Sequence, residues 1–383
     1  MPYITAFQRP KTHQLTLDEV LAGEVDLNSP KYRGCARIPF TVTVYTETVP
    51  PELSREVDAE FLTARLKDFT SRHSSLYEGD RHLLYRTFPI PKKSGGVRII
   101  NAPNEMLMDA LRELKTLFER EFRAMYHTSA FAYVKGRCCV DAVKRHQSNG
   151  SRWFLKTDFS DFFGSTTKPF VMKQLSTIFP FSEVCRTEDG YAALDRAVEL
   201  CFLDGGLPQG TPISPLLTNV MMIPVDMTLC NKLREHGFVY TRYADDIIIS
   251  HRCDFAYRQT VELIDRTLHE FQAPFRIKPQ KTRYGSSAGH NFNLGVMLNK
   301  DNEITVGWKN VKRFKAMVSS FILDCQNGNI WDVHEVQALT GLASYYKMVD
   351  DDMVKHVVDH MNQKFKADFY ALVKAALNGK TEG

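Results

Sequence analysis

The sequence predicts an α+β fold, because strand-like and helix-like patterns both recur along most of the chain. Residues 238–250 set β-favouring apolar residues on either side of two adjacent aspartates, as expected for two strands joined by a tight turn. Residues 153–163 begin as another apolar strand that ends in an aspartate. Residues 105–126 carry leucines and aromatics at helical spacing, and the last third of the chain contains three helical stretches. The sequence therefore places acidic residues at strand ends, among helices.

Helical spacing, alternation and Gly/Pro breaks assign the remaining elements. In the first half we expect an extension over residues 1 to about 50 with strand character at 40–46, a helix over 52–72, a hairpin over 86–100, a strand over 130–137 that runs into a basic turn, and a helix over 138–146. In the second half we expect helices over 216–227, 257–271, 310–325, 333–348 and 352–376.

The charge of the chain is unevenly distributed. Its 383 residues carry a formal net charge of +4 and are 43% hydrophobic. Residues 81–156 contain fifteen Lys or Arg against six Asp or Glu, and residues 272–315 contain nine against two. Two basic zones on an acidic background indicate a track for a polyanion. Solvated faces of ordinary helices are the alternative explanation.

No segment is long and apolar enough to predict a membrane span, and residues 1–16 lack the apolar core of a signal peptide. The eight cysteines are scattered and include no C-x-x-C pair, so neither a zinc site nor a disulfide framework is expected. We expect a cytoplasmic protein without a membrane partner, and its length suggests two or three domains.

The three aspartates at strand ends form the candidate catalytic centre. Asp245 and Asp246 repel each other, and Asp158 at the end of an apolar strand is costly to bury unless it is paired or metal-bound. Mg²⁺ prefers oxygen ligands, and two such ions about 3.5–4 Å apart serve in phosphoryl-transfer sites. A solvated acidic turn is the alternative for the adjacent pair.

Two further segments suit a nucleotide. The hairpin over 86–100 has a Ser-Gly-Gly turn with Lys92, Lys93 and Arg98 around it, and cations are the usual clamp on phosphoryl charge. A plain basic surface hairpin is the alternative. Residues 205–219 combine three glycines and three prolines with a glutamine, so the backbone could approach a planar or phosphate-bearing ligand closely. Here the alternative is a loop that leads into a helix cap.

Taken in order, four motifs resemble those of reverse transcriptases, most closely the bacterial group of retron, group II intron and defence-associated enzymes. They are FLKTDFSDFF at 154–163, GLPQGTPISP at 206–215, YADD at 243–246 and KTR at 281–283, and the resemblance extends from about residue 81 to 348. It implies a right-hand polymerase fold with fingers, a palm of antiparallel sheet and helices, and a helical thumb. In these terms residues 1–80 are an N-terminal extension, 81–150 the fingers, 151–304 the palm with part of the fingers at about 170–204, and 305–383 the thumb.

The resemblance also implies roles for individual residues. Asp158 and Asp245 would bind two Mg²⁺ ions, or Mn²⁺, with Asp246 and Phe159 also at the metal site. Lys281 would lie near the leaving pyrophosphate, as a general acid. The chemistry would be in-line attack of a primer 3′-hydroxyl on the α-phosphorus of a dNTP. The expected catalytic residues are therefore Asp158, Asp245, Asp246 and Lys281.

Substrate contacts follow from the same resemblance. Phe163 would exclude a 2′-hydroxyl from the sugar pocket by steric clash. The other expected dNTP contacts are Lys92 or Lys93, Arg98, Phe159, Gln209 and Gly210. The expected nucleic-acid contacts are Arg137, Tyr243, Arg283, Lys309, Lys312 and Arg313, where phosphate binding adds salt-sensitive affinity.

Two departures bear on the subgroup. Retron enzymes carry Asn-Ala-x-x-His before the first catalytic strand, where this chain has DAVKRH at 141–146. They carry Val-Thr-Gly where this chain has Asn-Leu-Gly at 293–295, which is closer to the group II intron pattern. The chain also ends soon after the expected thumb, without room for a maturase DNA-binding part or a nuclease.

We therefore expect a stand-alone reverse transcriptase that makes cDNA from its own structured non-coding RNA template in bacterial phage defence. An associated effector protein or a homo-oligomer is left open. The alternatives are a retron enzyme that makes msDNA, a protein-primed or untemplated DNA polymerase, and a catalytically silent RNA-binding scaffold. Retention of all three aspartates argues against the scaffold. Phe163 argues against an RNA-dependent RNA polymerase, which must accept a 2′-hydroxyl.

Overall fold

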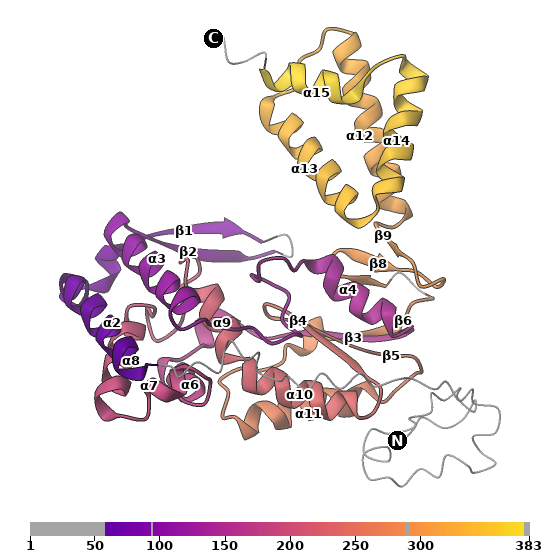
Figure 1. Cartoon of the computed structure of the whole chain (residues 1–383). Helices are drawn as coiled ribbons and strands as arrows, with labels where there is room; N and C mark the ends of the chain where they lie inside the picture. Colours follow the sequence, from indigo (N-terminus) through magenta and orange to yellow (C-terminus); the bar gives the residue numbers. More distant parts are fainter. Residues whose placement is uncertain (1–57, 93–94, 289–290, 379–383) are drawn as a thin grey trace, which may run out of the picture. The chain divides into compact units, whose positions relative to one another are not determined.

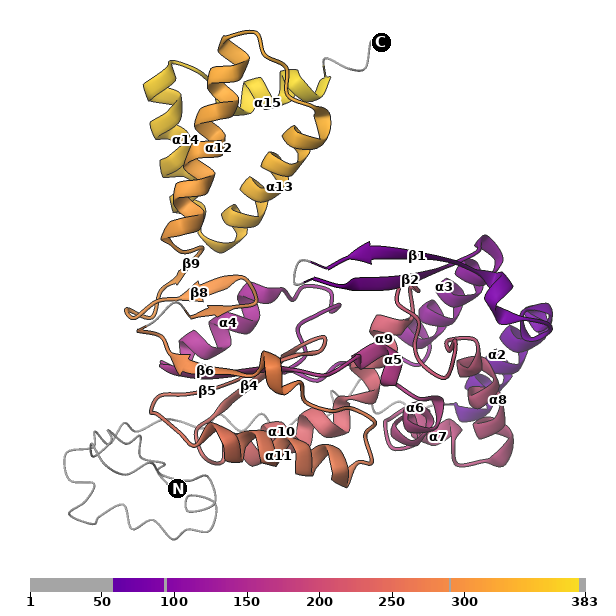
Figure 2. The same cartoon turned by 180° about the vertical axis from the view of Figure 1, so that it is seen from behind.

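The computed structural model describes residues 58–92, 95–288 and 291–378 (Figures 1 and 2). The expected strand at 40–46, the start of the expected helix at 52–72 and the cation Lys93 lie outside these ranges. The chain divides into two compact units, each described here by itself. Unit 1 comprises residues up to 138 and 153–284, and unit 2 comprises residues 139–152 and those from 285 onward.

A helical layer of unit 1 is built around α2 (Ala59–Arg72) and α3 (Glu105–Arg120). The Asn104 side chain accepts a hydrogen bond from the Leu107 amide and so begins α3, whose leucines then bury one face. α3 ends at Arg120 rather than at the expected Tyr126, because Arg123 takes a left-handed conformation with φ 45°. Five further helices of unit 1 follow Asp158 in the chain: α5 (Phe162–Ser165), α6 (Lys168–Leu175), α7 (Phe181–Val184), α8 (Glu188–Glu199) and α9 (Ser214–Met221).

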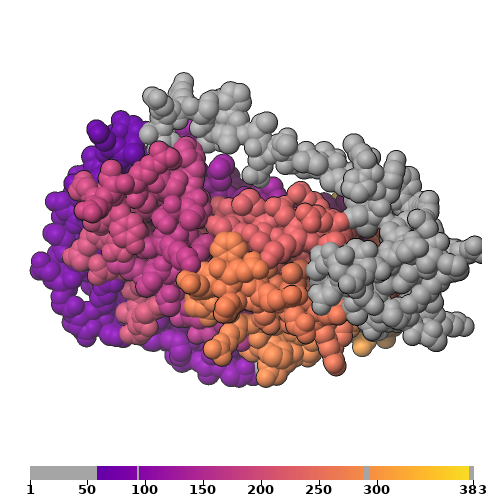
Figure 3. All heavy atoms as spheres, turned by 90° about the horizontal axis from the view of Figure 1, so that it is seen from below, coloured from indigo at the N-terminus to yellow at the C-terminus, as the bar shows by residue number. Residues whose placement is uncertain are grey.

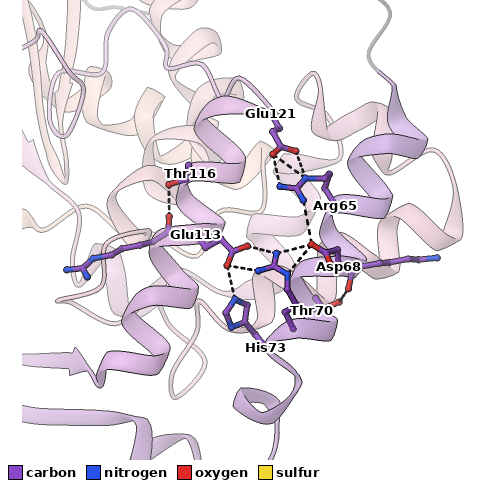
Figure 4. A network of polar contacts seen from close by, with 10 residues as sticks. Arg65, Asp68, Thr70, His73, Glu113, Thr116 and Glu121 are labelled. Atoms are coloured by element: carbon purple, nitrogen blue, oxygen red, sulfur yellow. Dashed lines mark hydrogen bonds and ion pairs between the residues drawn. The ribbon is translucent and has the colours of Figure 1, made fainter.

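Ion pairs join α2 to α3 on the surface (Figure 4). Arg65 pairs with Glu121 at 2.9 Å, and Arg72 pairs with Glu113 at 2.6 Å. His73 Nε2 lies 2.9 Å from the same Glu113 carboxylate. Because these side chains are partly exposed, the network adds only modestly to stability.

The expected hairpin is confirmed as β1 (Tyr85–Pro91) and β2 (Val97–Pro103), preceded by the 3-10 turns η3 (Ser74–Tyr77) and η4 (Arg81–Leu84). Its two strands pair antiparallel from Tyr85 opposite Pro103 to Pro91 opposite Val97. Most of its side chains are exposed.

A four-stranded sheet in the order β4-β5-β3-β6 positions the aspartates. Its strands are β3 (Trp153–Asp158), β4 (Val239–Tyr243), β5 (Asp246–His251) and β6 (Arg283–Ser286), with the 3-10 turn η5 (Pro279–Lys281) just before the last. The helices α10 (Ile223–Arg234) and α11 (Tyr257–Glu270) run along one face of this sheet (Figures 1 and 2). Their outer side forms the closed surface, salmon to orange, at the centre of Figure 3. The core beneath contains apolar residues of both helices and of strands β3 to β5.

Unit 2 combines a small sheet with a helical bundle. α4 (Cys139–Ser148) packs on a three-stranded sheet of β7 (Phe292–Asn293), β8 (Val296–Leu298) and β9 (Ile304–Thr305). The bundle consists of α12 (Trp308–Gln326), α13 (Val333–Val349), α14 (Asp351–Phe365) and α15 (Phe369–Asn378) around its own apolar core. A capping box of Asp332 and Glu335 begins α13.

Three expected elements are corrected by the structure. Residues 130–137 form no strand: a single bridge joins Ala130 to Arg242, and the rest is a loop held by side chains. The helix expected over 216–227 is two helices, α9 and α10. The last expected helix, 352–376, is interrupted at Lys366, which takes a left-handed conformation with φ 49° and separates α14 from α15.

Candidate active site

The three aspartates meet at one end of the central sheet. Asp158 is the last residue of β3 and lies opposite Asp246, the first residue of β5, in the antiparallel register. Asp245 occupies the two-residue turn between β4 and β5, where Tyr243 pairs with Asp246. Residues 88 positions apart in the chain therefore become neighbours through strand pairing.

The turn that carries Asp245 is held by backbone contacts. Ala244 takes a left-handed conformation with φ 57°, which lets a two-residue loop close the hairpin. The Phe159 amide donates a 3.1 Å hydrogen bond to the Asp245 carbonyl. The end of β3 is thus tied directly to the turn, and the position of Asp245 relative to Asp158 is set by the main chain.

A buried ion pair supports the same turn from behind. The Arg242 guanidinium and the Asp226 carboxylate of α10 are both fully buried, and Nε donates to both carboxylate oxygens, at 2.9 and 3.1 Å, while Nη2 donates to Oδ2 at 2.7 Å. Arg242 Nη1 also donates to the Ala244 carbonyl at 3.1 Å, and the Tyr240 hydroxyl donates to Asp226 at 2.7 Å. These residues are not among the predicted site residues, although a charged residue inside an apolar strand was a signal available from the sequence.

Lys281 lies at the same end of the sheet. Its Nζ contacts Asp158 Oδ2. η5 places it there, because the Lys278 amide donates a 2.9 Å hydrogen bond to the Asp158 carbonyl and fixes this turn against β3. The bond to Asp158 raises the pKa of the Lys281 ammonium. Lys281 is therefore a protonated group beside a buried carboxylate.

The other two carboxyls are harder to ionise than a free aspartate. Desolvation raises the pKa of Asp245, and the negative charge of Asp158 raises it further. Lys281 and Arg98 oppose this increase through their positive charge. Desolvation, with the charges of Asp245 and Asp158, raises the pKa of Asp246 to about 6. Three acids so close together require additional positive charge to be fully ionised.

The donor set at this position suits a hard divalent cation. Asp158 is 2% exposed, and its Oδ1 atom is buried without a hydrogen-bond partner. An unpartnered buried carboxylate oxygen beside two more carboxyls is the chemistry that Mg²⁺ or Mn²⁺ ligation satisfies. Within the described ranges, no three His, Cys, Asp or Glu side chains are placed so that they alone could hold a metal ion. Backbone oxygens or substrate oxygens would have to complete the coordination shell.

Three of the expected nucleotide contacts are linked to one another by the backbone. The Leu207 amide donates a 2.9 Å hydrogen bond to the Phe163 carbonyl, and the Asn101 amide of β2 donates a 2.8 Å bond to the Gln209 carbonyl. Gly210 allows this approach: with φ 119°, an added Cβ would lie 2.9 Å from the Asn101 oxygen. The Pro-Gln-Gly loop, residues 208–210, therefore joins the β1–β2 hairpin to the segment that carries Phe163.

Three other expected nucleotide contacts differ in how much of the side chain a ligand can reach. The Phe159 ring is 1% exposed and packs on Phe162 and Phe275, so only its backbone can face a ligand. Arg98 is exposed on β2, and its charge acts on Asp245. Lys92 is exposed at the end of the hairpin, where its amide bonds the Gly96 carbonyl at 3.0 Å.

The expected nucleic-acid contacts fall in both units. In unit 1, Tyr243 adjoins the turn that carries Asp245, whereas Arg137 and Arg283 each use Nη1 to hold two backbone carbonyls. In unit 2, Trp308 is 72% exposed at the start of α12, and its ring lies 5.4 Å from the Lys312 ammonium. The other two basic residues expected there, Lys309 and Arg313, are exposed on the same helix.

Comparison with known proteins decides the family. Residues 90–310, more than half of the chain and including Asp158, Asp245 and Asp246, match the family described as reverse transcriptase (RNA-dependent DNA polymerase). The chain belongs to the reverse transcriptase family. This confirms the predicted family, the right-hand polymerase fold class and the expectation of an enzyme of the RNA-directed DNA polymerase type.

Its curated relatives include retron enzymes. The chain is 29% identical over 299 residues to the retron Mx65 reverse transcriptase of Myxococcus xanthus, a match that covers 75% of this chain and 66% of that protein. It is 26% identical over 291 residues to the retron Ec73 reverse transcriptase of Escherichia coli, covering 73% and 86%. The bacterial retron-type resemblance is thereby confirmed. The match to Mx65 leaves about a third of that relative's length uncovered.

Solved structures similar to this reverse transcriptase include apo telomerase from Candida tropicalis. That comparison has a TM-score of 0.45 and 10% identity, and it covers 82% of this chain and 66% of that one. The family match, and not this distant likeness, supports the fold assignment. None of the helices in the described part of the chain combines the length and apolar character needed to cross a bilayer.

Proposed function

We propose that this reverse transcriptase copies an RNA template into cDNA by adding dNTPs to a primer 3′-hydroxyl. The observation that carries the proposal is the meeting of Asp158, Asp245 and Asp246 beside Lys281 at one end of the sheet. Membership of the family supplies the reaction class, and this geometry supplies the residues.

In this proposal Asp158 and Asp245 hold two Mg²⁺ ions, or Mn²⁺, with Asp246 and the Phe159 backbone as further ligands. Bound ions of this kind polarise phosphoryl oxygens and stabilise the charge that develops on them. Lys281 holds a proton beside the leaving pyrophosphate, a role supported by its contact with Asp158.

The substrate contacts are proposed on the same basis. Arg98, Lys92 and Lys93 bind the triphosphate, and Gln209 with Gly210 lines the base. Phe163 closes the sugar pocket to a 2′-hydroxyl. Arg137, Tyr243 and Arg283 in unit 1 contact the nucleic acid, together with Lys309, Lys312 and Arg313 on α12. The proposed domains are a fingers region over 81–150, a palm over 151–304 and a thumb over 305–383.

Primer extension tests this proposal. The purified chain, an RNA template, a DNA primer, dNTPs and Mg²⁺ should give a product of template length. Asp245→Asn should reduce the rate at least about 1,000-fold, because a metal-ligating charge at the reacting phosphate is lost. The matched control is Asp109→Asn, at an exposed position on α3. Equal rates in the Asp245→Asn and wild-type proteins would contradict the assignment of the site.

The biological setting is proposed from similarity alone. We propose a structured non-coding RNA template, a cytoplasmic location and a role in bacterial phage defence. A retron-type enzyme that makes msDNA is the second candidate, and it is supported by the relatives named above. Sequencing the nucleic acid that co-purifies with the chain distinguishes these outcomes, because it gives the template and any RNA or protein joined to the product. Phage plaque counts on cells carrying wild-type or Asp245→Asn protein test the defence role.

A further inference from the structure

The loop that contains Tyr133 is fixed on both sides of that residue. The Phe131 amide donates to the Arg242 carbonyl at 2.9 Å, and the Arg242 amide donates to the Ser129 carbonyl at 2.7 Å. The buried Asn219 side chain of α9 donates to the Ala132 carbonyl at 2.8 Å. On the other side, Arg137 Nη1 bonds the carbonyls of two residues earlier in the same loop. The loop is therefore built against β4 and α9, and the Tyr133 backbone is held in place.

Tyr133 adopts a backbone conformation that is unfavourable for it. Its φ is 60°, in the left-handed region that residues with a Cβ avoid. Its side chain is nevertheless 56% exposed, so packing in the core does not offset this strain. Strained residues that persist in a rigid surrounding cluster at functional sites. A bulky aromatic held outward in this way indicates a role at the surface of the site.

The Tyr133 ring contacts the ring of Phe163, which suggests what that role is. Its centroid lies 6.5 Å from the centroid of the Phe163 ring, with the two planes at 76°, an edge-to-face arrangement. Partial desolvation raises the pKa of Tyr133, and the nearby negative charge of Asp245 raises it further. Tyr133 thus contacts the proposed sugar gate and lies within reach of the charge on Asp245.

Phe163 has other contacts as well. Its ring packs edge-on against Phe162 at 5.8 Å, and its carbonyl is bound by the Leu207 amide. These contacts hold the Phe163 backbone and part of its ring. Besides Phe162, the exposed Tyr133 is the described aromatic residue whose ring contacts Phe163. Removing that ring would let Phe163 rotate away from a substrate sugar.

We infer that Tyr133 is a specificity-determining positioning residue, whose ring holds Phe163 against the nucleotide sugar so that ribonucleotides are rejected. This inference rests on the proposed function. It assigns to Tyr133 a contribution to the ratio of kcat/KM for dNTP over that for the matching rNTP, and no part in bond formation.

The test measures that ratio for the full chain on an RNA template with a DNA primer and Mg²⁺. Tyr133→Ala should lower the ratio about three- to tenfold, which is the factor expected from losing one aromatic pair. The change should come from a higher kcat/KM for rNTP, because a merely structural role would lower both substrates alike. Tyr133→Phe should keep the wild-type ratio, since the ring remains. Tyr191→Ala, at an exposed tyrosine on α8, is the matched control and should not change it.

A double-mutant cycle decides whether Tyr133 acts through Phe163. In a Phe163→Ala background, Tyr133→Ala should have no further effect on the ratio, because the ring that it positions is gone. The same factor in both backgrounds would overturn the inference, and so would a wild-type ratio in Tyr133→Ala or an equal loss in Tyr133→Phe. A wild-type chain that incorporates no dNTP would instead overturn the proposed function, and the inference would fall with it.

Discussion

The two hairpins of unit 1 carry groups proposed to act on the same nucleotide, yet they are held very differently. In the β4–β5 hairpin, Ile247 and Ile249 are fully buried, and the Arg242–Asp226 pair locks the strand next to the turn. In the β1–β2 hairpin, Val97 and Ile99 are 54% and 51% exposed. The aspartates therefore lie in a firmly packed part of the protein. The proposed phosphate-binding cations instead lie on the β1–β2 hairpin, residues 85–103, which has few packing contacts and is called the arm below.

The physical reason lies in where the apolar contacts are. Local stability follows the burial of side chains around a segment, and exposed segments open at lower free energy than the core. The main link described between the arm and the rest of the site is the backbone bond from Asn101 to Gln209. A bound triphosphate could therefore set the position of the arm without disturbing the aspartates.

Breaking the ion pair behind the catalytic turn should have the largest effect on stability. Arg242→Met leaves Asp226 buried without its cation and should lower the free energy of unfolding by about 3–5 kcal/mol. Urea unfolding followed by circular dichroism measures this. The control is Arg112→Met, which removes an exposed partner of Asp109 and should cost less than about 1 kcal/mol.

A companion variant separates loss of the pair from loss of arginine itself. Arg242→Met combined with Asp226→Leu removes both charges and should recover part of the lost stability, since no charge stays buried alone. A double variant less stable than Arg242→Met would show that the hydrogen bonds to Ala244 and Tyr240, and not charge burial, dominate.

The same substitution in both hairpins tests the comparison directly. Ile249→Ala in β5 creates a cavity in the core and should cost about 2–4 kcal/mol of unfolding free energy. Ile99→Ala in β2 removes an exposed side chain and should change it by no more than about 0.5 kcal/mol. Similar losses in the two variants would mean that the arm is as firmly packed as the catalytic hairpin.

The link between the arm and the Pro-Gln-Gly loop should matter for substrate more than for stability. Gly210→Ala puts a Cβ at a position 2.9 Å from the Asn101 oxygen, in a backbone conformation that alanine disfavours. We expect kcat/KM for dNTP to fall about tenfold because the nucleotide is misplaced. Steady-state primer extension measures it, with Gly341→Ala, where the added Cβ meets open space, as control. An unchanged kcat/KM would separate the loop from nucleotide binding.

The smallest effect should come from a single cation on the arm. Arg98→Gln should raise KM for dNTP up to about fivefold with little change in kcat, as expected for one solvent-exposed charge interaction. Raising the salt concentration should shrink the difference from wild type. Arg86→Gln, farther from the hairpin tip, is the matched control and should leave KM unchanged. A larger fall in kcat than rise in KM would place Arg98 in the chemical step.

Local patterns made the carboxylates predictable. β-Favouring runs around Asp158 and around the Asp245–Asp246 pair mark strands and a turn without any knowledge of long-range contacts, and the register of the sheet then brings them together. The hairpin at 86–100 could likewise be predicted from the sequence, because its Gly-Gly turn is a local signal.

Long-range contacts decided what local patterns could not. Residues 130–137 contain a strand-like run of small and aromatic residues, but Arg242 and Asn219 bind their backbone and hold them as a loop. These contacts place Tyr133 beside Phe163, and no local pattern marks a tyrosine that takes a left-handed conformation. The break at Lys366 was missed because the helical spacing continues through it.

By itself, the sequence determined the reaction class, through aspartates placed at strand ends and motifs in a characteristic order. Only the tertiary structure decided how the site is supported. The buried Arg242 behind the Asp245 turn is neutralised by Asp226, 16 residues earlier in the chain, and Asn219 of α9 holds the loop that places Tyr133 beside Phe163. Strand and turn preferences act between neighbouring residues, whereas burial of a charge and the position of a loop depend on partners that only folding brings together.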